Sequence, residues 1–281
     1  EQGATPVFAD IKYEDLNIDP KSIEKKITSK TKAIMVVHYG GNSCDMDRIG
    51  EIGRKYSLPI IEDAAHAMGS IYKGDYIGAK GDIICFSLQV VKIINSGDGG
   101  LISTPNDKYY EKLKRIVWYG IDRDEKKTSL LDPLPSGFRG DTLGFKYNMN
   151  DITATLACVG IDHYEEAAKK RRIIGERYRR ELTGLSKIKL MKYYDDRKPN
   201  YQIFPIHVEN RVRFAQYLRK HKIMVNINNR RNDIYHMFGG FRKDLVITAA
   251  ADKDVVLLPI HADLKEKQVS YIIKKVKDAQ K

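Results

Sequence analysis

The amino-acid sequence predicts an α/β fold with a mainly parallel central sheet and a smaller C-terminal α/β domain. Strand and helix patterns alternate through the first 120 residues, which is typical of parallel sheets. Residues 33–37 are all apolar and lead to His38, as expected for a strand over 33–38 in a sheet covered on both faces. A length of 281 residues allows one large or two modest domains. We therefore expect a large domain over residues 1–150, followed by connecting helices and a small domain over 151–281.

The elements of the first half have local signals in the sequence. Asp19 and Pro20 predict a helix start, because an acidic N-cap and a proline at the first helical position both favour helix initiation. Asp45 can cap a second helix in the same way. The predicted helices cover 19–27, 45–56 and 107–118. The predicted strands cover 6–9, 33–38, 58–62, 83–88 and 100–103.

The second half of the sequence is more helical. Residues 123–139 are polar and contain two prolines, which predicts a loop. A helical pattern runs from 152 to 182, with a bend near His163. Residues 201–208 alternate like a strand with one wet face. A helix, a short strand and a closing helix complete the smaller domain, over 211–221, 224–227 and 264–279.

The composition is that of an ordinary soluble globular protein, with 42% hydrophobic and 31% charged residues. No apolar run approaches the length of a membrane-spanning helix. The three cysteines, Cys44, Cys85 and Cys158, lack metal-ligand spacing, and Cys85 is interpreted as a small core residue. So few cysteines agree with a reducing compartment. We therefore predict a cytoplasmic protein without a metal site.

The net charge of +12 has two interpretations. Solvated helix faces, such as 169–172 and 177–180, account for part of it. The alternative is electrostatic attraction of an anion, such as the diphosphate of a nucleotide-sugar. The basic residues lack the interleaved aromatic residues of a single-strand binder, so nucleic acid is not an expected partner. Without a long apolar run, a membrane is not an expected partner either.

Residues with complementary chemistry follow two of the predicted strands. Asp63 comes directly after the strand 58–62, and Lys92 follows the strand 83–88 and precedes the glycine-rich turn 97–100. Ligands of such sheets bind outside the carboxyl ends of the strands. An acid, a lysine and the small hydroxyl of Ser87 are the parts that a pyridoxal phosphate (PLP) site needs: the lysine forms a Schiff base, the acid keeps the ring nitrogen protonated, and the hydroxyl receives the phosphate. A lone lysine would not indicate a site in a chain with 49 Lys and Arg. The prediction therefore depends on the order and spacing of Asp63, Ser87, Lys92 and the glycine-rich turn.

These motifs resemble the sugar aminotransferases of the DegT/DnrJ/EryC1/StrS family, which are fold-type I PLP enzymes with an aspartate aminotransferase-like fold. The resemblance rests on several segments in the right order and covers nearly the whole chain, weakening after about residue 200. The segments are 3–8, 32–41, 62–67, 81–82, 86–87, Lys92, 97–101 and 144–152. In the family, further strands precede the first of these segments, so an N-terminal portion of the large domain is expected to be missing.

The resemblance also implies roles for individual residues. PLP would be held by Asp63, His66, Ser87 and Lys92, with Lys92 as the catalytic residue. Lys146 would reach the PLP phosphate of the neighbouring subunit, in a homodimer with shared active sites. Glu62 is interpreted as structural, because it should point to the opposite face from Asp63. The substrate candidates are His38, Tyr39, Asn148 and Arg230.

The implied reaction is amination of a nucleotide-linked keto-sugar, a 4-keto-6-deoxy-hexose or a 4-keto-pentose, with glutamate as amino donor. The variant at 144–148 resembles enzymes that aminate C4 rather than C3. Such amino-sugars enter lipopolysaccharide or O-antigen biosynthesis. Three alternatives stay open: a catalytically idle PLP- or sugar-binding relative, a PLP-dependent sugar dehydratase, and a basic nucleic-acid binder. In dehydratases a histidine replaces the Schiff-base lysine, whereas this chain has Lys92.

Overall fold

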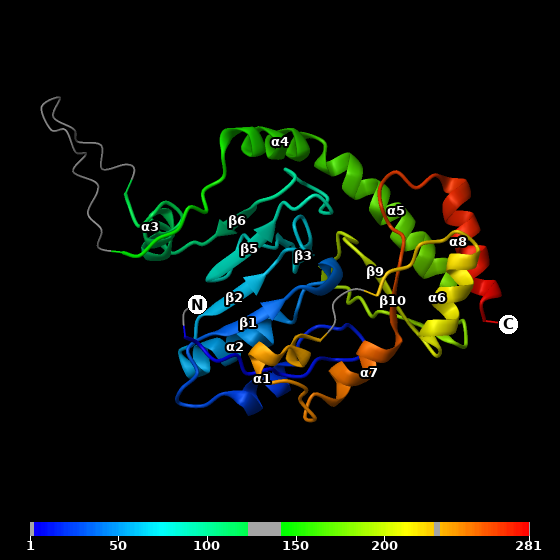
Figure 1. The fold of residues 1–281 in the computed structure, drawn as a ribbon, viewed down its shortest axis with the longest axis horizontal. Helices are drawn as coiled ribbons and strands as arrows, with labels where there is room; N and C mark the ends of the chain where they lie inside the picture. The colour runs from blue at the N-terminus through cyan, green and yellow to red at the C-terminus, as the bar shows by residue number, and fades with distance from the viewer. Residues whose placement is uncertain (1–2, 123–141, 228–230, 281) are drawn as a thin grey trace, which may run out of the picture.

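The computed structural model describes residues 3–122, 142–227 and 231–280. The chain forms a central four-stranded sheet, a three-stranded sheet in its second half, and a small three-stranded sheet that joins distant segments. Figure 1 shows the central sheet and the C-terminal sheet side by side. Helix α4 (Asp151–Asp162) lies above β6 (Gly100–Ser103), and α5 (Tyr164–Leu182) descends towards α6 (Arg211–Lys220) and α8 (Glu266–Asp278). None of the described helices is long and apolar enough to cross a membrane.

The central sheet has the strand order β1–β2–β5–β6. Its members are β1 (Ile34–Val37), β2 (Ile60–Asp63), β5 (Ile83–Ser87) and β6 (Gly100–Ser103). The first three are parallel, and β6 is antiparallel to β5. The mainly parallel sheet is therefore confirmed. Parallel order brings the carboxyl ends of β1, β2 and β5 to one edge of the sheet.

The helices of the first half begin where their caps predict. Asp19 accepts the N–H of Lys21 at the start of α1 (Pro20–Lys26), and Asp45 accepts the N–H of Arg48 at the start of α2 (Met46–Tyr56). Both helices pack on one face of the sheet through a buried apolar cluster. Its members include Ile23, Ile34, Val36, Ile49, Ile52 and Ile60. The third predicted helix is α3 (Asp107–Ile116).

The opposite face of the central sheet is open in the described structure. Burial alternates along β1, so that Met35 is 60% exposed and Val37 43% exposed. Ile102 of β6 is 47% exposed. The expectation that both faces are covered is therefore wrong for the described residues. An apolar run indicates that a strand can be buried on both faces. The packing of other elements decides which faces are buried.

The long helical stretch after residue 150 consists of two helices. α4 (Asp151–Asp162) and α5 (Tyr164–Leu182) are separated at His163, which lies at φ −98° and ψ 1°. The predicted bend near His163 is thus confirmed. Through α5 the chain passes from the central sheet to the C-terminal half (Figure 1).

The C-terminal sheet is antiparallel, in the order β10–β9–β7. Its strands are β7 (Ile188–Leu190), β9 (Phe204–Val208) and β10 (Val255–Leu258). One face packs on α5, α6 (Arg211–Lys220) and α8 (Glu266–Asp278). The other packs on α7 (Val246–Asp254) and on the N-terminal segment near Leu16. Every residue of β9 is buried, so the predicted wet face is wrong.

Short elements connect the two halves. β3 (Ile71–Tyr72) pairs with β4 (Asp75–Tyr76) and with β8 (Arg197–Lys198) in a small antiparallel sheet. The predicted strand at 224–227 is reduced to an isolated bridge from Asn226 to Leu257. Two short 3₁₀ helices follow, η2 (Asn232–Ile234) and η3 (His236–Phe238).

The N-terminal segment packs against the C-terminal half. Residues 6–9 form no strand, so that prediction is wrong. The carboxylate of Asp10 accepts the N–H groups of Ile247 and Thr248 at 2.8 and 2.7 Å. Leu16 lies in one apolar cluster with Met191 and Leu257. The division of the chain at residue 150 stays a prediction, because these contacts join both sides of it.

Candidate active site

Asp63 ends β2 at the carboxyl edge of the central sheet. It pairs with Val37 of β1 and Cys85 of β5, so all three side chains lie on the open face. Asp63 Oδ1 accepts the N–H of Ala65 at 3.0 Å, which fixes the carboxylate at the start of the following turn. The carboxylate forms no ion pair in the described structure. Its charge is therefore available to a ligand.

Lys92 lies in the turn between β5 and β6. The turn is closed by backbone hydrogen bonds: Val90 N–H donates to the carbonyl of Gly97 at 2.9 Å, and Ser96 N–H donates to that of Leu88 at 2.9 Å. Gly97 has φ 83°, a conformation that glycine adopts without strain. The glycine-rich turn therefore holds the backbone of Lys92 in a defined position beside the sheet edge.

The charges of Asp63 and Lys92 influence the pKa values of side chains at this sheet edge. Burial lowers the pKa of Lys92, and the carboxylate of Asp63 opposes that shift. Burial, and then the charge of Lys92, lower the pKa of His66 to about 4, again opposed by Asp63. His66 is consequently neutral near pH 7. A lysine with a lowered pKa has more of its amine unprotonated, which makes it a better nucleophile.

His66 has a buried polar atom that no protein group satisfies. Its Nδ1 is shielded from solvent and has no hydrogen-bond partner in the described structure. Such an atom costs about 1–3 kcal/mol unless a ligand or water bonds to it. His66 lies three residues after Asp63 in the turn that follows β2. The orphaned nitrogen therefore marks a position for a ligand atom.

Ser87 and Cys85 belong to the same end of β5. Ser87 Oγ accepts the N–H of Gln89 at 3.3 Å. Cys85 is half-buried on the face of Asp63, and burial, followed by the charge of Asp63, raises the pKa of its thiol. The interpretation of Cys85 as a core residue is therefore wrong: strand pairing puts it beside the site.

His38 is a structural residue. It is fully buried, its Nε2 donates to Glu62 Oε2 at 2.8 Å, and its Nδ1 accepts the N–H of Cys44 at 3.1 Å. With both nitrogens engaged, His38 has none left for a substrate, so its prediction as a substrate residue is wrong. Glu62 is 2% exposed and points away from Asp63, which confirms its structural interpretation.

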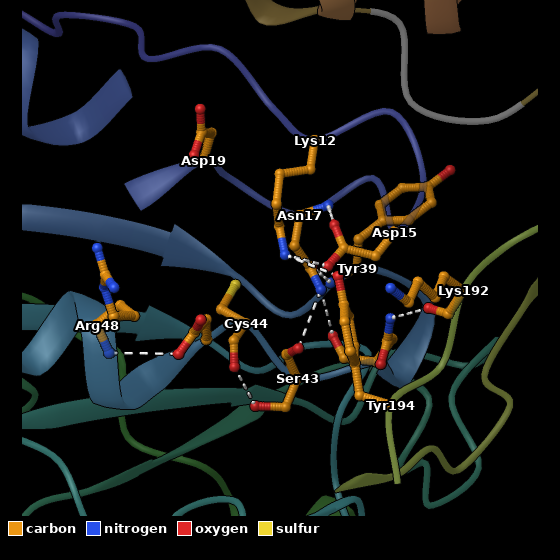
Figure 2. Close-up of polar contacts among 12 residues, drawn as sticks. Lys12, Asp15, Asn17, Asp19, Tyr39, Ser43, Cys44, Arg48, Lys192 and Tyr194 are labelled. Carbon is orange, nitrogen blue, oxygen red and sulfur yellow. Dashed lines mark hydrogen bonds and ion pairs between the residues drawn. The ribbon is translucent and has the colours of Figure 1, made fainter. Parts of the chain in front are cut away.

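Tyr39 begins the short helix η1 (Tyr39–Gly41) after β1, and its ring centroid lies 6.3 Å from that of His66. The buried Asn17 fixes this loop, as Figure 2 shows. Asn17 Oδ1 accepts the N–H of Tyr39 at 3.0 Å, and Asn17 Nδ2 donates to the carbonyls of Asn42 and Ser43, each at 3.1 Å. Tyr39 is thus held at the edge of the site.

Lys146 and Asn148 lie apart from this cluster within the chain. Lys146 Nζ donates to Asn148 Oδ1 at 2.5 Å and lies 4.4 Å from the ring centroid of Trp118. Neither side chain contacts Asp63 or Lys92 of the same chain in the described structure. Arg230 lies outside the described residues.

One contact to the site was not predicted from the sequence. Gln202 Nε2 donates to the carbonyl of Val91, the residue before Lys92, at 2.8 Å. The only available signal was a pair of amides, Asn200 and Gln202, directly before an apolar strand. Amides in that position are usually solvated, so no local pattern singles them out.

A parallel sheet that presents a half-buried lysine, an unpaired carboxylate and a neutral imidazole at its carboxyl edge defines an enzyme site of the α/β class. The model of the DegT/DnrJ/EryC1/StrS aminotransferase family matches residues 1–277. The chain belongs to this family.

Several known proteins are similar to this chain in sequence or in fold. The uncharacterized protein MJ1066 of Methanocaldococcus jannaschii is 33% identical over 286 residues, which cover 98% of this chain and 74% of that protein. The sugar aminotransferase CalS13 from Micromonospora echinospora has a TM-score of 0.87 and 26% identity, with 96% of this chain and 73% of that chain covered. Spr1654 from Streptococcus pneumoniae, in its PMP form, has a TM-score of 0.90 and 27% identity, with 99% and 76% covered. Spr1654 is also known in a PLP form. The fold is accordingly that of the fold-type I aminotransferases.

Proposed function

We propose that this chain is a PLP-dependent aminotransferase that aminates a keto-sugar carried on a nucleotide. One observation carries the proposal: an amine with a lowered pKa, an unpaired carboxylate and an imidazole with an orphaned buried nitrogen meet at one sheet edge, on Lys92, Asp63 and His66. The family match supports the same reaction class.

The residues present fit PLP. Asp63 offers a carboxylate to the protonated pyridine nitrogen, and Nδ1 of His66 is free to bond to the phenolic oxygen. The hydroxyl of Ser87 and the N–H groups of the glycine turn suit the phosphate. Bound PLP supplies the electron sink that lets an amino group leave one carbon and join another.

The chain's own residues supply binding and proton transfer. Lys92 would hold PLP covalently through its amine, and glutamate is the proposed amino donor. With its amine free, Lys92 would act as the base and then the acid that moves a proton during amino transfer. Asp63 would keep the ring nitrogen of PLP protonated, because its negative charge opposes loss of the ring proton.

The proposal includes a homodimer with shared sites. The helix α4 exposes Ile152, Leu156 and Val159, at 77%, 52% and 52%. A helix that is apolar on its outer face is normally covered by another element. Lys146 precedes α4 closely, so a partner seated on α4 would bring Lys146 towards the PLP phosphate of the other subunit.

Mixing inactive Lys92→Ala and Lys146→Ala chains should then restore part of the activity in heterodimers, whereas a fully active monomer would contradict the shared site.

The proposed substrate is a nucleotide-diphosphate 4-keto-sugar, used in the cytoplasm for lipopolysaccharide or O-antigen precursors. Two features support it. The segment 145–148 resembles that of C4-aminating enzymes. The positive charge is also segregated: residues 1–150 contain 21 Lys and Arg and 21 Asp and Glu, whereas residues 151–281 contain 28 and 16, a difference of +12. A positive field of this kind attracts a diphosphate.

The experiment supplies the protein with PLP, glutamate and either a UDP- or dTDP-linked 4-keto-sugar or its 3-keto isomer, and measures formation of the amino-sugar and of 2-oxoglutarate. We expect amination of the 4-keto-sugar. Amination of the 3-keto isomer alone would contradict C4 selectivity. Amination of neither, with brisk transfer to simple keto acids, would overturn the sugar assignment. Elimination of water from the sugar would favour a dehydratase.

A further inference from the structure

Residues 200–202, which we call the strap, contact the loops that carry the candidate site residues. Gln202 is 7% exposed, and its Nε2 donates to the Val91 carbonyl at 2.8 Å. Asn200 is 3% exposed, and its Nδ2 donates to the carbonyl of Met68, two residues after His66, at 2.8 Å. One short segment from the C-terminal half thus holds both the Lys92 turn and the His66 turn.

The strap also reaches the loop of Tyr39. Asn200 N–H donates to Ser70 Oγ at 3.2 Å, and Ser70 Oγ donates to the carbonyl of Gly41 at 2.7 Å. The contact is close: a side chain at Gly41 would overlap Asn200, since a Cβ there would stand 1.9 Å from Asn200 Oδ1. Gly41 itself has φ 85°, which favours glycine.

Two side chains of helix α5, Arg171 and Glu176, form hydrogen bonds to the strap. The buried guanidinium of Arg171 donates through Nη1 to the carbonyls of Tyr201 and Gln202, at 3.3 and 3.0 Å. Tyr201 is 1% exposed, and its hydroxyl donates to Glu176 at 2.5 Å. Gln202 N–H donates to Asn200 Oδ1 at 2.9 Å, which locks the two amides to each other. The strap therefore has the fixed geometry that a positioning element needs.

We propose that Gln202 is a positioning residue for Lys92, and that the strap sets the approach of the Lys92 amine to its reaction partner. The other hydrogen bonds of this turn run within the segment 87–99, whereas the Gln202 bond ties the turn to a separate, rigid element. Removal of that bond frees the backbone beside Lys92 and leaves the Val91 carbonyl without its buried partner. The proposal rests on the proposed role of Lys92.

The test replaces Gln202 with methionine, which has a similar length and no donor. Tyr201→Phe is the matched control, because it removes one hydrogen bond from the same strap but on the side of α5. Gln202→Asn, one methylene shorter, serves if Gln202→Met fails to fold. The first readout is amide hydrogen exchange of the peptide that covers 88–97, in the whole chain without cofactor. We expect exchange on the order of fivefold faster in Gln202→Met, with little change in Tyr201→Phe.

The second readout is the rate at which added PLP, trapped with borohydride, appears on the peptide that contains Lys92. We expect trapping several-fold slower in Gln202→Met and unchanged in Tyr201→Phe. Faster exchange with normal trapping would reduce Gln202 to a structural residue and overturn the proposal, as would unchanged exchange. Failure of the wild-type chain to trap PLP on Lys92 would instead overturn the proposed function, which separates the two outcomes.

Discussion

The two sheets of this chain are built differently. In the C-terminal sheet every residue of β9 and β10 is buried, and 20 buried residues form one apolar cluster around it. In the central sheet the cluster beneath α1 and α2 has seven buried members, and the other face exposes Met35 and Val37. The unpaired carboxylate of Asp63 and the unbonded Nδ1 of His66 both lie at the edge of the central sheet. Covered strands supply stability, whereas an open sheet edge leaves charges and polar atoms available to a ligand.

The largest expected effect is the loss of turnover when the Lys92 amine is removed. Lys92→Ala should abolish amino transfer and reduce kcat by several orders of magnitude, because no other group in the site can form the covalent bond. Turnover and visible absorbance after addition of PLP measure this loss. Lys80→Ala, at an exposed lysine of the loop before β5, is the control and should retain normal turnover. Appreciable turnover in Lys92→Ala would show that another lysine does the work.

Asp63→Asn tests the unpaired carboxylate. The change keeps the shape and removes the charge that opposes loss of the ring proton, so kcat should fall by about 10²–10³-fold, or about 3–4 kcal/mol of transition-state stabilisation. Asp98→Asn removes an exposed carboxylate from the turn between β5 and β6 and should have little effect. Near-normal kcat in Asp63→Asn would assign the role to a different acid.

A pair of substitutions, one in the C-terminal core and one on the open face, tests the contrast between the two sheets. Leu218→Ala, at a fully buried site of the C-terminal core, should lower the free energy of unfolding by about 3 kcal/mol, because it leaves a cavity. Met35→Ala, on the open face, should change it by no more than about 0.5 kcal/mol. Denaturant unfolding measures both values. Equal losses would mean that another element or subunit covers Met35 in solution.

The low pKa of His66 predicts a pH-dependent stability. Its pKa is about 4 in the folded chain against a reference value of 6.5, so the unfolded state binds more protons between these values. The free energy of unfolding should therefore fall as the pH drops from 6.5 towards 4, by up to about 3 kcal/mol from this residue. His66→Gln should flatten that part of the pH profile. An unchanged slope in His66→Gln would place the titrating group elsewhere.

The smallest expected effect concerns the amine of Lys92. Burial lowers its pKa and Asp63 raises it, so Asp63→Asn should move the midpoint of Lys92 reactivity to still lower pH. Peptide-resolved labelling of Lys92 with an amine reagent across pH measures this midpoint. A shift to higher pH would contradict the sign of the Asp63 contribution.

Local signals explain why much of the fold could be predicted from the sequence. The caps Asp19 and Asp45, the apolar runs of β1, β2 and β5, and the break at His163 each act over a few residues, and each appears as expected. The sheet edge that joins Asp63 and Lys92 followed from parallel strand order alone. The predictions that failed concern which neighbours each face acquires, as for the wet face of β9.

Side-chain partners far apart in the sequence could not be read from local pattern. His38 looked available for substrate until Glu62 and Cys44 engaged both of its nitrogens, and Cys85 looked like a core residue until strand pairing set it beside Asp63. Gln202 reaches Val91 across 111 positions of sequence. Such contacts depend on tertiary packing, which no periodicity encodes.

The central claim is that Lys92 is the residue that binds PLP. The most direct measurement incubates the wild-type chain with PLP, reduces it with borohydride, and maps the modified peptide by mass spectrometry. We expect a single major adduct on the peptide that contains Lys92, and its loss in Lys92→Ala. A major adduct on a peptide without Lys92, or no adduct at all, would contradict the claim.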